Sequence, residues 1–254
     1  MNFQSPWPSP IDMWADPPWY MTGKCLTAWF ETDVNEVKKI LTPSFIPKVG
    51  KNGVITRLRF YDVDFSPVNA EKFPNKQFSG KFKEAVVAFA GEIDGVKGEY
   101  SAFMWTDNLV YLSWGRENFG WPLLISDIEL SGSFWDSSSS KETKGGISAE
   151  SATWVLTCEK DVLETLNVGP GTNWLTPRRI LYPQQKTFEK RDLLIVNPTI
   201  LKPGTLTSHK GEVNFSAADN SIFAGLQPLG PTTIHQHSNF LLSVGKDVES
   251  RSEK

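Results

Sequence analysis

Glu84 is the side chain of this 254-residue sequence best placed for acid–base chemistry. It directly precedes an apolar run, residues 85–90, which we expect to pass through the protein core. A carboxyl group inside a closed apolar pocket is desolvated, so its pKa rises toward neutrality and it can donate or accept a proton. The alternative is a strand-edge glutamate that faces water beside Lys81 and Lys83.

The histidines form only a weak metal-binding pattern. His235 and His237 alternate, so on a strand both would face one side, as metal ligands sometimes do. No Cys, Asp or Glu near them in the sequence supplies a third ligand, so we interpret the pair as surface or interface polar groups. The sequence also lacks a Gly-x-Gly-x-x-Gly fingerprint, a Gly-x-Ser-x-Gly elbow and a phosphate loop. We therefore expect no metal and no cofactor.

The segment from residue 115 to residue 124 reads Gly-Arg-Glu-Asn-Phe-Gly-Trp-Pro-Leu-Leu. It resembles the active-site segment of the acetoacetate decarboxylase family, where a Gly-Arg-Glu turn leads to an aromatic-Pro pair and then to two lysines. The resemblance implies that the first lysine forms a Schiff base with a keto substrate and that the second lowers its pKa. Here both positions are leucines, Leu123 and Leu124. Because leucine cannot add to a carbonyl, an imine at this position is chemically excluded.

The resemblance to this family spans residues 22–215. Residues 95–108 look like the strand-turn-strand run into the active-site loop, and counting back from this run places the family's catalytic glutamate on Glu84. Residues 30–41 resemble the strand, cap and helix that open the family domain, and a weaker match covers residues 173–200. The match to the family glutamate favours a catalytic role for Glu84 over an exposed position.

Two basic residues are also interpreted through the resemblance. In the family the arginine at the position of Arg116 mostly holds the loop, and a bidentate bond to Glu117 or to a backbone carbonyl would satisfy it. We include Arg116 with Glu84 as a catalytic candidate. The family also places an arginine on the first strand near the substrate carboxylate, where this chain has Lys24 and Cys25. Without that arginine the grip on a β-keto acid is weaker. Lys24 is the leading candidate for another lysine in the pocket, and the alternative is a solvated strand-end lysine.

Aromatic residues are numerous, with ten tryptophans and sixteen phenylalanines. Most such side chains fill the core of a β protein, but some can form the wall of a pocket for a flat or apolar ligand. Trp105, Trp114 and Trp121 cluster around the turn described above. We therefore expect these three to line a substrate pocket, together with the two leucines and Lys24.

Composition excludes several classes of protein. The net charge of −3, with acids and bases interspersed, gives no electrostatic footprint for nucleic acid. Two cysteines make no disulfide framework and fit a reducing compartment. The N-terminus lacks the regions of a secretory signal, and no run approaches the ~18 apolar residues of a membrane helix. We expect a cytoplasmic protein without nucleic-acid or membrane partners, and a homo-oligomer, as members of the family tend to be.

The hydrophobic pattern predicts mostly strands. An Asp33 cap followed by apolar residues at helical spacing predicts a helix that ends near Leu41, and short helical turns are expected at 117–119 and 161–166. Period-two runs predict strands at 54–63, 85–93, 100–105, 125–134, 152–158, 176–181, 193–196, 212–216 and 240–244.

These elements and the resemblance predict a mainly β (α+β) protein. We expect acetoacetate decarboxylase-like curved antiparallel sheets, or a barrel, around a central pocket with few short helices. The single domain covers residues 22–245. A Pro- and Trp-rich arm (1–21) precedes it, and a charged tail (246–254) follows it.

The leading functional hypothesis is a cofactor-independent enzyme that acts on an apolar small molecule. Glu84 would move a proton, and the aromatic and leucine side chains would shape a polyketide- or terpenoid-like intermediate for cyclisation, isomerisation or dehydration. Two leucines in place of two cations would make the site suitable for such a substrate. The alternatives are a decarboxylase of a β-keto acid by a lysine-free route and a non-catalytic small-molecule binding protein.

Overall fold

The computed structural model describes residues 18–67, 80–136, 140, 142–149, 152–167, 172–182, 187–219 and 221–252. In chain order its elements are β1 (Trp19–Thr32), α1 (Val34–Ile40), β2 (Phe45–Pro47), β3 (Val54–Pro67), β4 (Gly80–Ile93), β5 (Val96–Thr106), α2 (Leu109–Phe119), β6 (Leu123–Ile125), β7 (Ile128–Gly132), β8 (Glu142–Ala149), β9 (Ala152–Leu166), β10 (Trp174–Tyr182), β11 (Thr187–Lys202), β12 (Thr205–Ala217) and β13 (Thr233–Ser252).

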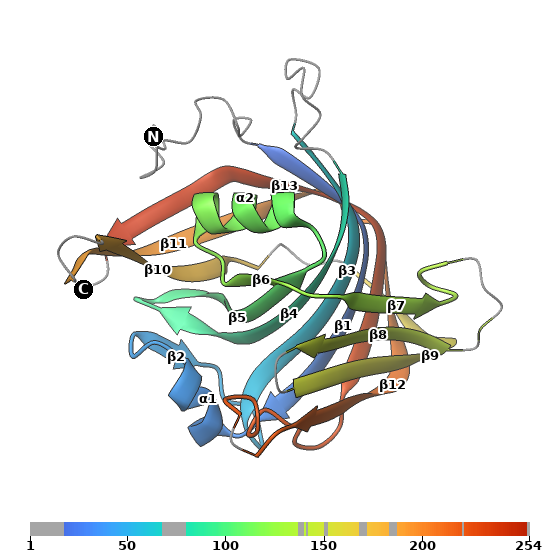
Figure 1. Ribbon diagram of the computed structural model, residues 1–254. Helices are drawn as coiled ribbons and strands as arrows, with labels where there is room; N and C mark the ends of the chain where they lie inside the picture. The colour runs from blue at the N-terminus through green and yellow to red at the C-terminus, as the bar shows by residue number, and fades with distance from the viewer. Residues whose placement is uncertain are drawn as a thin grey trace.

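Seven of these strands close into a barrel. Their order is β1, β3, β4, β5, β10, β11 and β13, and β13 pairs again with β1 (Figure 1). The contact of β5 with β10 is parallel, and the other pairings of the barrel are antiparallel. The sheet then continues from β13 through β12, β9, β8 and β7, while β2 pairs with β4 and β6 pairs with β5. The fold is therefore mainly β, as the sequence predicted.

Two hydrophobic cores lie on the two faces of the sheet formed by β1, β3, β4 and β5, because side chains alternate along each strand. The inner core lies inside the barrel, and its members come from most of the barrel strands and from the α2–β6 region: Trp19, Met21, Cys25, Val63, Phe65, Phe82, Val86, Ala88, Met104, Tyr111, Trp114, Phe119, Trp121, Leu123, Leu194, Val196, Phe240 and Val244. The outer core lies under β7, β8, β9 and β12 and includes Phe60, Phe89, Trp105, Trp154 and Phe223.

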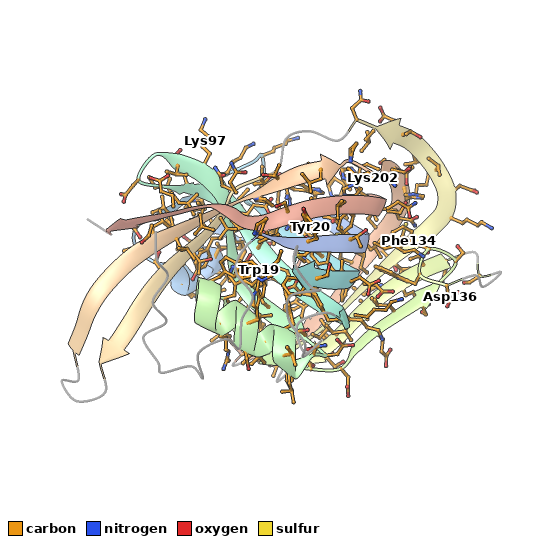
Figure 2. The ribbon with its side chains drawn as sticks, turned by 90° about the horizontal axis from the view of Figure 1, so that it is seen from above. Trp19, Tyr20, Lys97, Phe134, Asp136 and Lys202 are labelled. Atoms are coloured by element: carbon orange, nitrogen blue, oxygen red, sulfur yellow. The ribbon has the colours of Figure 1, made fainter. Side chains whose placement is uncertain are left out.

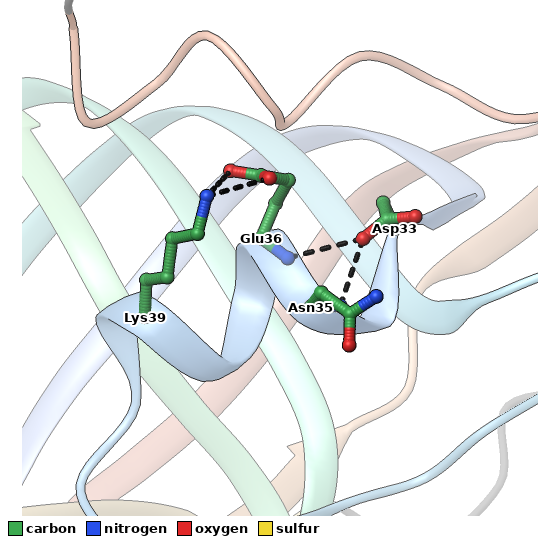
Figure 3. Close-up of polar contacts among 4 residues, drawn as sticks. All are labelled: Asp33, Asn35, Glu36 and Lys39. Carbon is green, nitrogen blue, oxygen red and sulfur yellow. Dashed lines mark hydrogen bonds and ion pairs between the residues drawn. The ribbon is translucent and has the colours of Figure 1, made fainter.

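Helix α1 begins where the sequence predicted. The carboxylate of Asp33 accepts hydrogen bonds from the backbone nitrogens of Asn35 and Glu36 (Figure 3). Glu36 also pairs with Lys39 one turn later. The single buried residue of the helix, Val37, joins the outer core.

Two expected helices differ in the structure. The predicted helix at 161–166 is part of β9, where Val162 and Glu164 pair with β12. The helical turn at 117–119 is the end of the longer helix α2. The expected charged tail is paired with β11 as far as Ser252, and β1 begins at Trp19, inside the expected arm. Residues 1–17 of that arm lie outside the described residues. No helix in the described part of the chain is long and apolar enough to cross a membrane.

Candidate active site

Glu84 lies on β4 with its side chain on the inner face of the barrel. It stands opposite Tyr61 of β3 and Thr106 of β5. Its neighbours on the same face of β4 are Phe82 and Val86, which belong to the inner core. Only 3% of Glu84 is exposed. Strand β4 therefore holds the carboxyl group of Glu84 inside the protein and not on a water-facing edge.

Burial controls the charge of this carboxyl group. The Tyr111 hydroxyl donates a hydrogen bond of 3.1 Å to Oε1 of Glu84. Burial raises the pKa of Glu84 from 4.5 to about 8, against the opposing effects of the Tyr111 hydrogen bond and of the charge on Arg59. Burial likewise raises the pKa of Tyr111 well above its ordinary value, so the phenol stays protonated and remains a donor. A carboxyl group that titrates near neutral pH is suited to proton transfer.

The connection between β5 and α2 positions Tyr111 against Glu84. The Thr106 hydroxyl donates to the backbone carbonyl of Lys83 at 2.9 Å, and the Asp107 carboxylate accepts a hydrogen bond from the backbone nitrogen of Lys83 at 2.8 Å. Asn108 then caps the helix by accepting hydrogen bonds from the nitrogens of residues 110 and 111. The first turn of α2 is thus fixed to the residue that precedes Glu84.

The Gly-Arg-Glu turn holds Leu123 in the inner core. Gly120 ends α2 in the left-handed conformation, at φ 68°, and its backbone N–H donates to the carbonyl of Arg116 at 3.0 Å, as in the αL capping motif. The Nε atom of Arg116 donates to the carbonyl of Leu123 at 2.7 Å. A Cβ atom on Gly115 would lie 2.4 Å from Cδ1 of Leu123, so only glycine allows the helix to approach this closely. Arg116 therefore contacts a backbone carbonyl, one of the two partners proposed for it from the sequence.

An aromatic cluster surrounds Trp114 on the inner face. Trp114 lies 5.6 Å from Trp121, 5.5 Å from Tyr111 and 4.9 Å from Trp19, measured between ring centroids. Trp19 is on β1, above α2 in the view of Figure 2. Of the expected pocket residues, the structure thus brings Trp114, Trp121 and Leu123 to the same face as Glu84.

The other three expected pocket residues lie elsewhere. Trp105 belongs to the outer core, 5.5 Å from Trp154, because it is opposite Ala85 and so faces away from Glu84. Leu124 is paired with Trp105 and is 37% exposed. The amine of Lys24 donates to the carbonyls of Phe134 and Trp135, in the turn after β7. The structure does not bring Lys24 to the position of an imine-forming lysine.

Several polar residues on the inner face were missed in the sequence. Arg57 and Arg59 of β3 both form ion pairs with Glu99 of β5. Arg59 also donates to the hydroxyl of Tyr61 at 3.3 Å. Arg57 and Arg59 alternate with buried Leu58 and Phe60, a pattern that normally indicates a solvated strand face. Their shared ion-pair partner, Glu99 of β5, shows that they instead face the interior. Tyr111 was also missed. Asn108, three residues before it, is a helix-capping residue and was the sequence signal that could have placed Tyr111 in the first turn of a helix.

His235 shares the inner face with these residues, since it lies opposite Thr27 of β1, which is itself opposite Arg59 of β3. Nε2 of His237 lies 2.5 Å from the carbonyl of Pro203, and His209 contacts Thr207 and the carbonyls of residues 159 and 161. Within the described ranges, no three His, Cys, Asp or Glu side chains come together as a metal-binding group.

The fold and the turn agree with the comparisons to known proteins. The family model for acetoacetate decarboxylase matches residues 4–169, and the chain belongs to this family. It is therefore a member of the acetoacetate decarboxylase-like enzyme superfamily. No curated protein matches the sequence.

Similar solved structures support the same fold at low identity. The enduracididine biosynthesis enzyme MppR with bound HEPES is 14% identical, with a TM-score of 0.75 over 95% of this chain and 90% of that chain. The acetoacetate decarboxylase from Legionella pneumophila is 14% identical, with a TM-score of 0.71 over 98% and 93%. An acetoacetate decarboxylase-like enzyme from Sphingomonas wittichii RW1 is 18% identical, with a TM-score of 0.69 over 99% of both chains.

Proposed function

We propose that this protein is a cofactor-independent enzyme that moves a proton on an apolar small molecule, without a Schiff base. The observation that carries the proposal is the buried Glu84 carboxyl, whose pKa is about 8 and whose Oε1 accepts a hydrogen bond from Tyr111. A group that exchanges its proton near neutral pH is an effective general acid or base. Leu123 is fully buried on the same face, where an imine-forming lysine would be needed for the family's chemistry.

The side chains around Glu84 support an apolar substrate. Phe82, Trp114, Trp121 and Leu123 contribute hydrocarbon and aromatic surface to the inner face. We propose a polyketide- or terpenoid-like intermediate that is cyclised, isomerised or dehydrated, because such reactions need a shaped apolar surface and one proton-transfer group. A cytoplasmic location and a homo-oligomeric state belong to the same proposal.

A second candidate is decarboxylation of a β-keto acid by a lysine-free route. The guanidinium groups of Arg57 and Arg59 favour it, since they place positive charge on the inner face although β1 carries no arginine. MppR has been solved in complex with pyruvate, an α-keto acid, so a protein of this fold can bind a small keto acid. In this reaction Glu84 would donate the proton that replaces carbon dioxide.

The test compares metabolite extracts of cells with and without the gene and then adds purified protein to whatever accumulates. A precursor isomeric with its product supports a cyclase or isomerase, and one heavier by a water supports a dehydratase. A precursor heavier by carbon dioxide supports the second candidate. If nothing accumulates, or if Glu84→Gln turns over the precursor as fast as the wild type, acid–base catalysis by Glu84 is wrong. If nothing accumulates, a non-catalytic small-molecule binding protein becomes the better description.

A further inference from the structure

A group of three charged side chains lies on the inner face of the barrel beside Glu84. Nη1 of Arg57 pairs with Oε1 of Glu99, and Nη2 of Arg59 pairs with Oε2 of the same carboxylate. Arg59 is 7% exposed and Glu99 is 1% exposed. Two cations therefore share one anion, and the group carries one positive charge that Glu99 does not neutralise. Such an excess charge is costly to bury without an anionic partner.

The titratable groups around these arginines do not supply the missing negative charge. Burial raises the pKa values of Tyr61 and Cys25, so the phenol and the thiol are uncharged at neutral pH. The pKa of Glu84, about 8, leaves its carboxyl mostly protonated. Burial and the like charge of Arg59 lower the pKa of Arg57 to about 8, as expected for a cation without full compensation. Its Nε atom is buried and has no hydrogen-bond partner within the described part of the chain.

The strand register places these guanidinium groups near Glu84. Tyr61 is directly opposite Glu84, and Arg59 is two residues further along β3 on the same face. Such diagonal neighbours in an antiparallel pair are about 7–8 Å apart, a separation that a carbonyl group and its neighbouring carbon can bridge. Thr27, opposite Arg59 on β1, and Tyr61 itself are only partly buried.

When the substrate of Glu84 is a carbonyl compound, a positive group at this position stabilises the negative charge that develops on oxygen. When a proton leaves the carbon next to a carbonyl, the C–H electron pair forms a C=C bond and the C=O π pair moves to oxygen. Loss of carbon dioxide from a β-keto acid gives the same enolate from a C–C pair. In Schiff-base catalysis a protonated imine accepts these electrons, and Leu123 cannot form one.

We propose that Arg59, with Arg57 beside it, stabilises the enolate oxygen that forms when the substrate reacts next to Glu84. The inference rests on the proposed function and extends it, because it defines the substrate as a carbonyl compound that reacts at the adjacent carbon. In an isomerisation the ionised form of Glu84 takes the proton from one carbon and gives it to another carbon of the enolate system, whereas in a decarboxylation the protonated form supplies its own proton. In both cases a C=C pair forms the new C–H bond, and the electron pair on oxygen returns to restore the carbonyl. The ion pairs with Glu99 fix both guanidinium groups before the substrate arrives, so little reorganisation is needed as the charge develops.

The test uses 4-nitrophenol as an enolate-like probe, because its visible absorbance reports the ionised form. The wild type should bind the phenolate and lower the apparent pKa of the bound phenol. Arg59→Leu should weaken phenolate binding by about tenfold to a hundredfold, the usual effect of losing a hydrogen bond to a charged group. This variant leaves Arg57 and Glu99 as a neutral pair, so we expect it to fold. Arg59→Lys keeps the charge and should recover part of the affinity.

Two further variants separate the possible outcomes. Lys81→Gln removes a cation from the same sheet at a side chain that is 78% exposed, and it should bind the phenolate as the wild type does. Glu84→Gln should retain phenolate binding even though it loses turnover. If the wild type does not bind the phenolate, or if Arg59→Leu binds it equally well, the inference is overturned. If Glu84→Gln keeps full turnover, the proposed function fails, while the phenolate result still reports on Arg59.

Discussion

The phenol of Tyr111 donates a hydrogen bond of 3.1 Å to Oε1 of Glu84 inside the barrel. Tyr111 is also held by Phe82, whose ring stacks on it at 3.7 Å between centroids. The hydrogen bond favours the ionised carboxyl, whereas burial favours the protonated one. Because burial has the larger effect, the pKa of Glu84 lies at about 8, near the pH at which a cell works.

Glu84→Gln should remove a pH dependence of stability. Since folding raises the pKa of Glu84 from 4.5 to about 8, the native state retains a proton in this window that the unfolded state has lost. The stabilisation is therefore complete below pH 4.5 and is lost as pH rises through 8. The loss is on the order of 5 kcal/mol. Glutamine resembles the protonated carboxyl and does not titrate. The unfolding free energy of the variant should therefore increase relative to that of the wild type as pH rises. Urea unfolding at several pH values measures the difference.

The control for this experiment is Glu129→Gln, at an exposed position of β7. Its unfolding free energy should follow the wild type at every pH. If the unfolding free energy of Glu84→Gln also follows that of the wild type at every pH, the pKa of Glu84 is not raised by folding. The proposal of acid–base catalysis by Glu84 would then be unsupported.

Tyr111→Phe should raise the pKa of Glu84 further. The Tyr111 hydrogen bond is the main effect that lowers this pKa, so its loss leaves burial less opposed. The variant should lose about 1 kcal/mol of stability, because one buried hydrogen bond is removed. The carboxyl carbon of Glu84, observed by NMR with labelled glutamate, reports the pKa directly. A downward shift would contradict the geometry described above.

Some parts of the fold follow from local sequence. The Asp33 cap and the apolar spacing after it placed α1 correctly, because both signals lie within one short segment. Helix α2 was predicted only in its last turn, with Gly120 and Pro122 as the residues that break it. In the structure Gly120 does end the helix, and Gly115 within it allows close contact with Leu123. The role of each glycine depends on what packs against it.

The composition of the candidate site depends on strand register, which no local pattern contains. Trp105 is close in sequence to the Gly-Arg-Glu turn, yet its pairing with Ala85 turns it away from Glu84. An irregularity in the pairing between β4 and β5, next to Ala102, also breaks the alternation of faces along β5. Arg59 was missed for a related reason, because its partner Glu99 is far away in the sequence. The structure places Trp114, Trp121 and Leu123 on the same face as Glu84, and their roles as pocket residues remain predictions.

Gly115→Ala should destabilise the protein although alanine favours helices. The new methyl group would lie 2.4 Å from Cδ1 of Leu123 and 2.9 Å from the ring of Trp121, so both must move. Overpacking of this kind costs about 1–3 kcal/mol, partly offset by up to about 1 kcal/mol of helix propensity. Thermal and urea unfolding measure the net loss. Gly146→Ala is the control, because its methyl group would meet nothing closer than 3.9 Å. Equal stability of the two variants would mean that α2 does not depend on this close contact.

Leu123→Lys should create an amine that forms an imine with acetoacetate. Leu123 is fully buried on the face of Glu84, so a lysine there would be desolvated and partly neutral at neutral pH, and hence nucleophilic. Reduction with borohydride would trap the adduct, and peptide mass spectrometry would locate it. Leu124→Lys is the matched control, because residue 124 is 37% exposed and is paired with Trp105 on the other face. Trapping at residue 123 alone would show that a keto compound reaches the inner face, whereas equal trapping at both positions, or none, would contradict a substrate site beside Glu84.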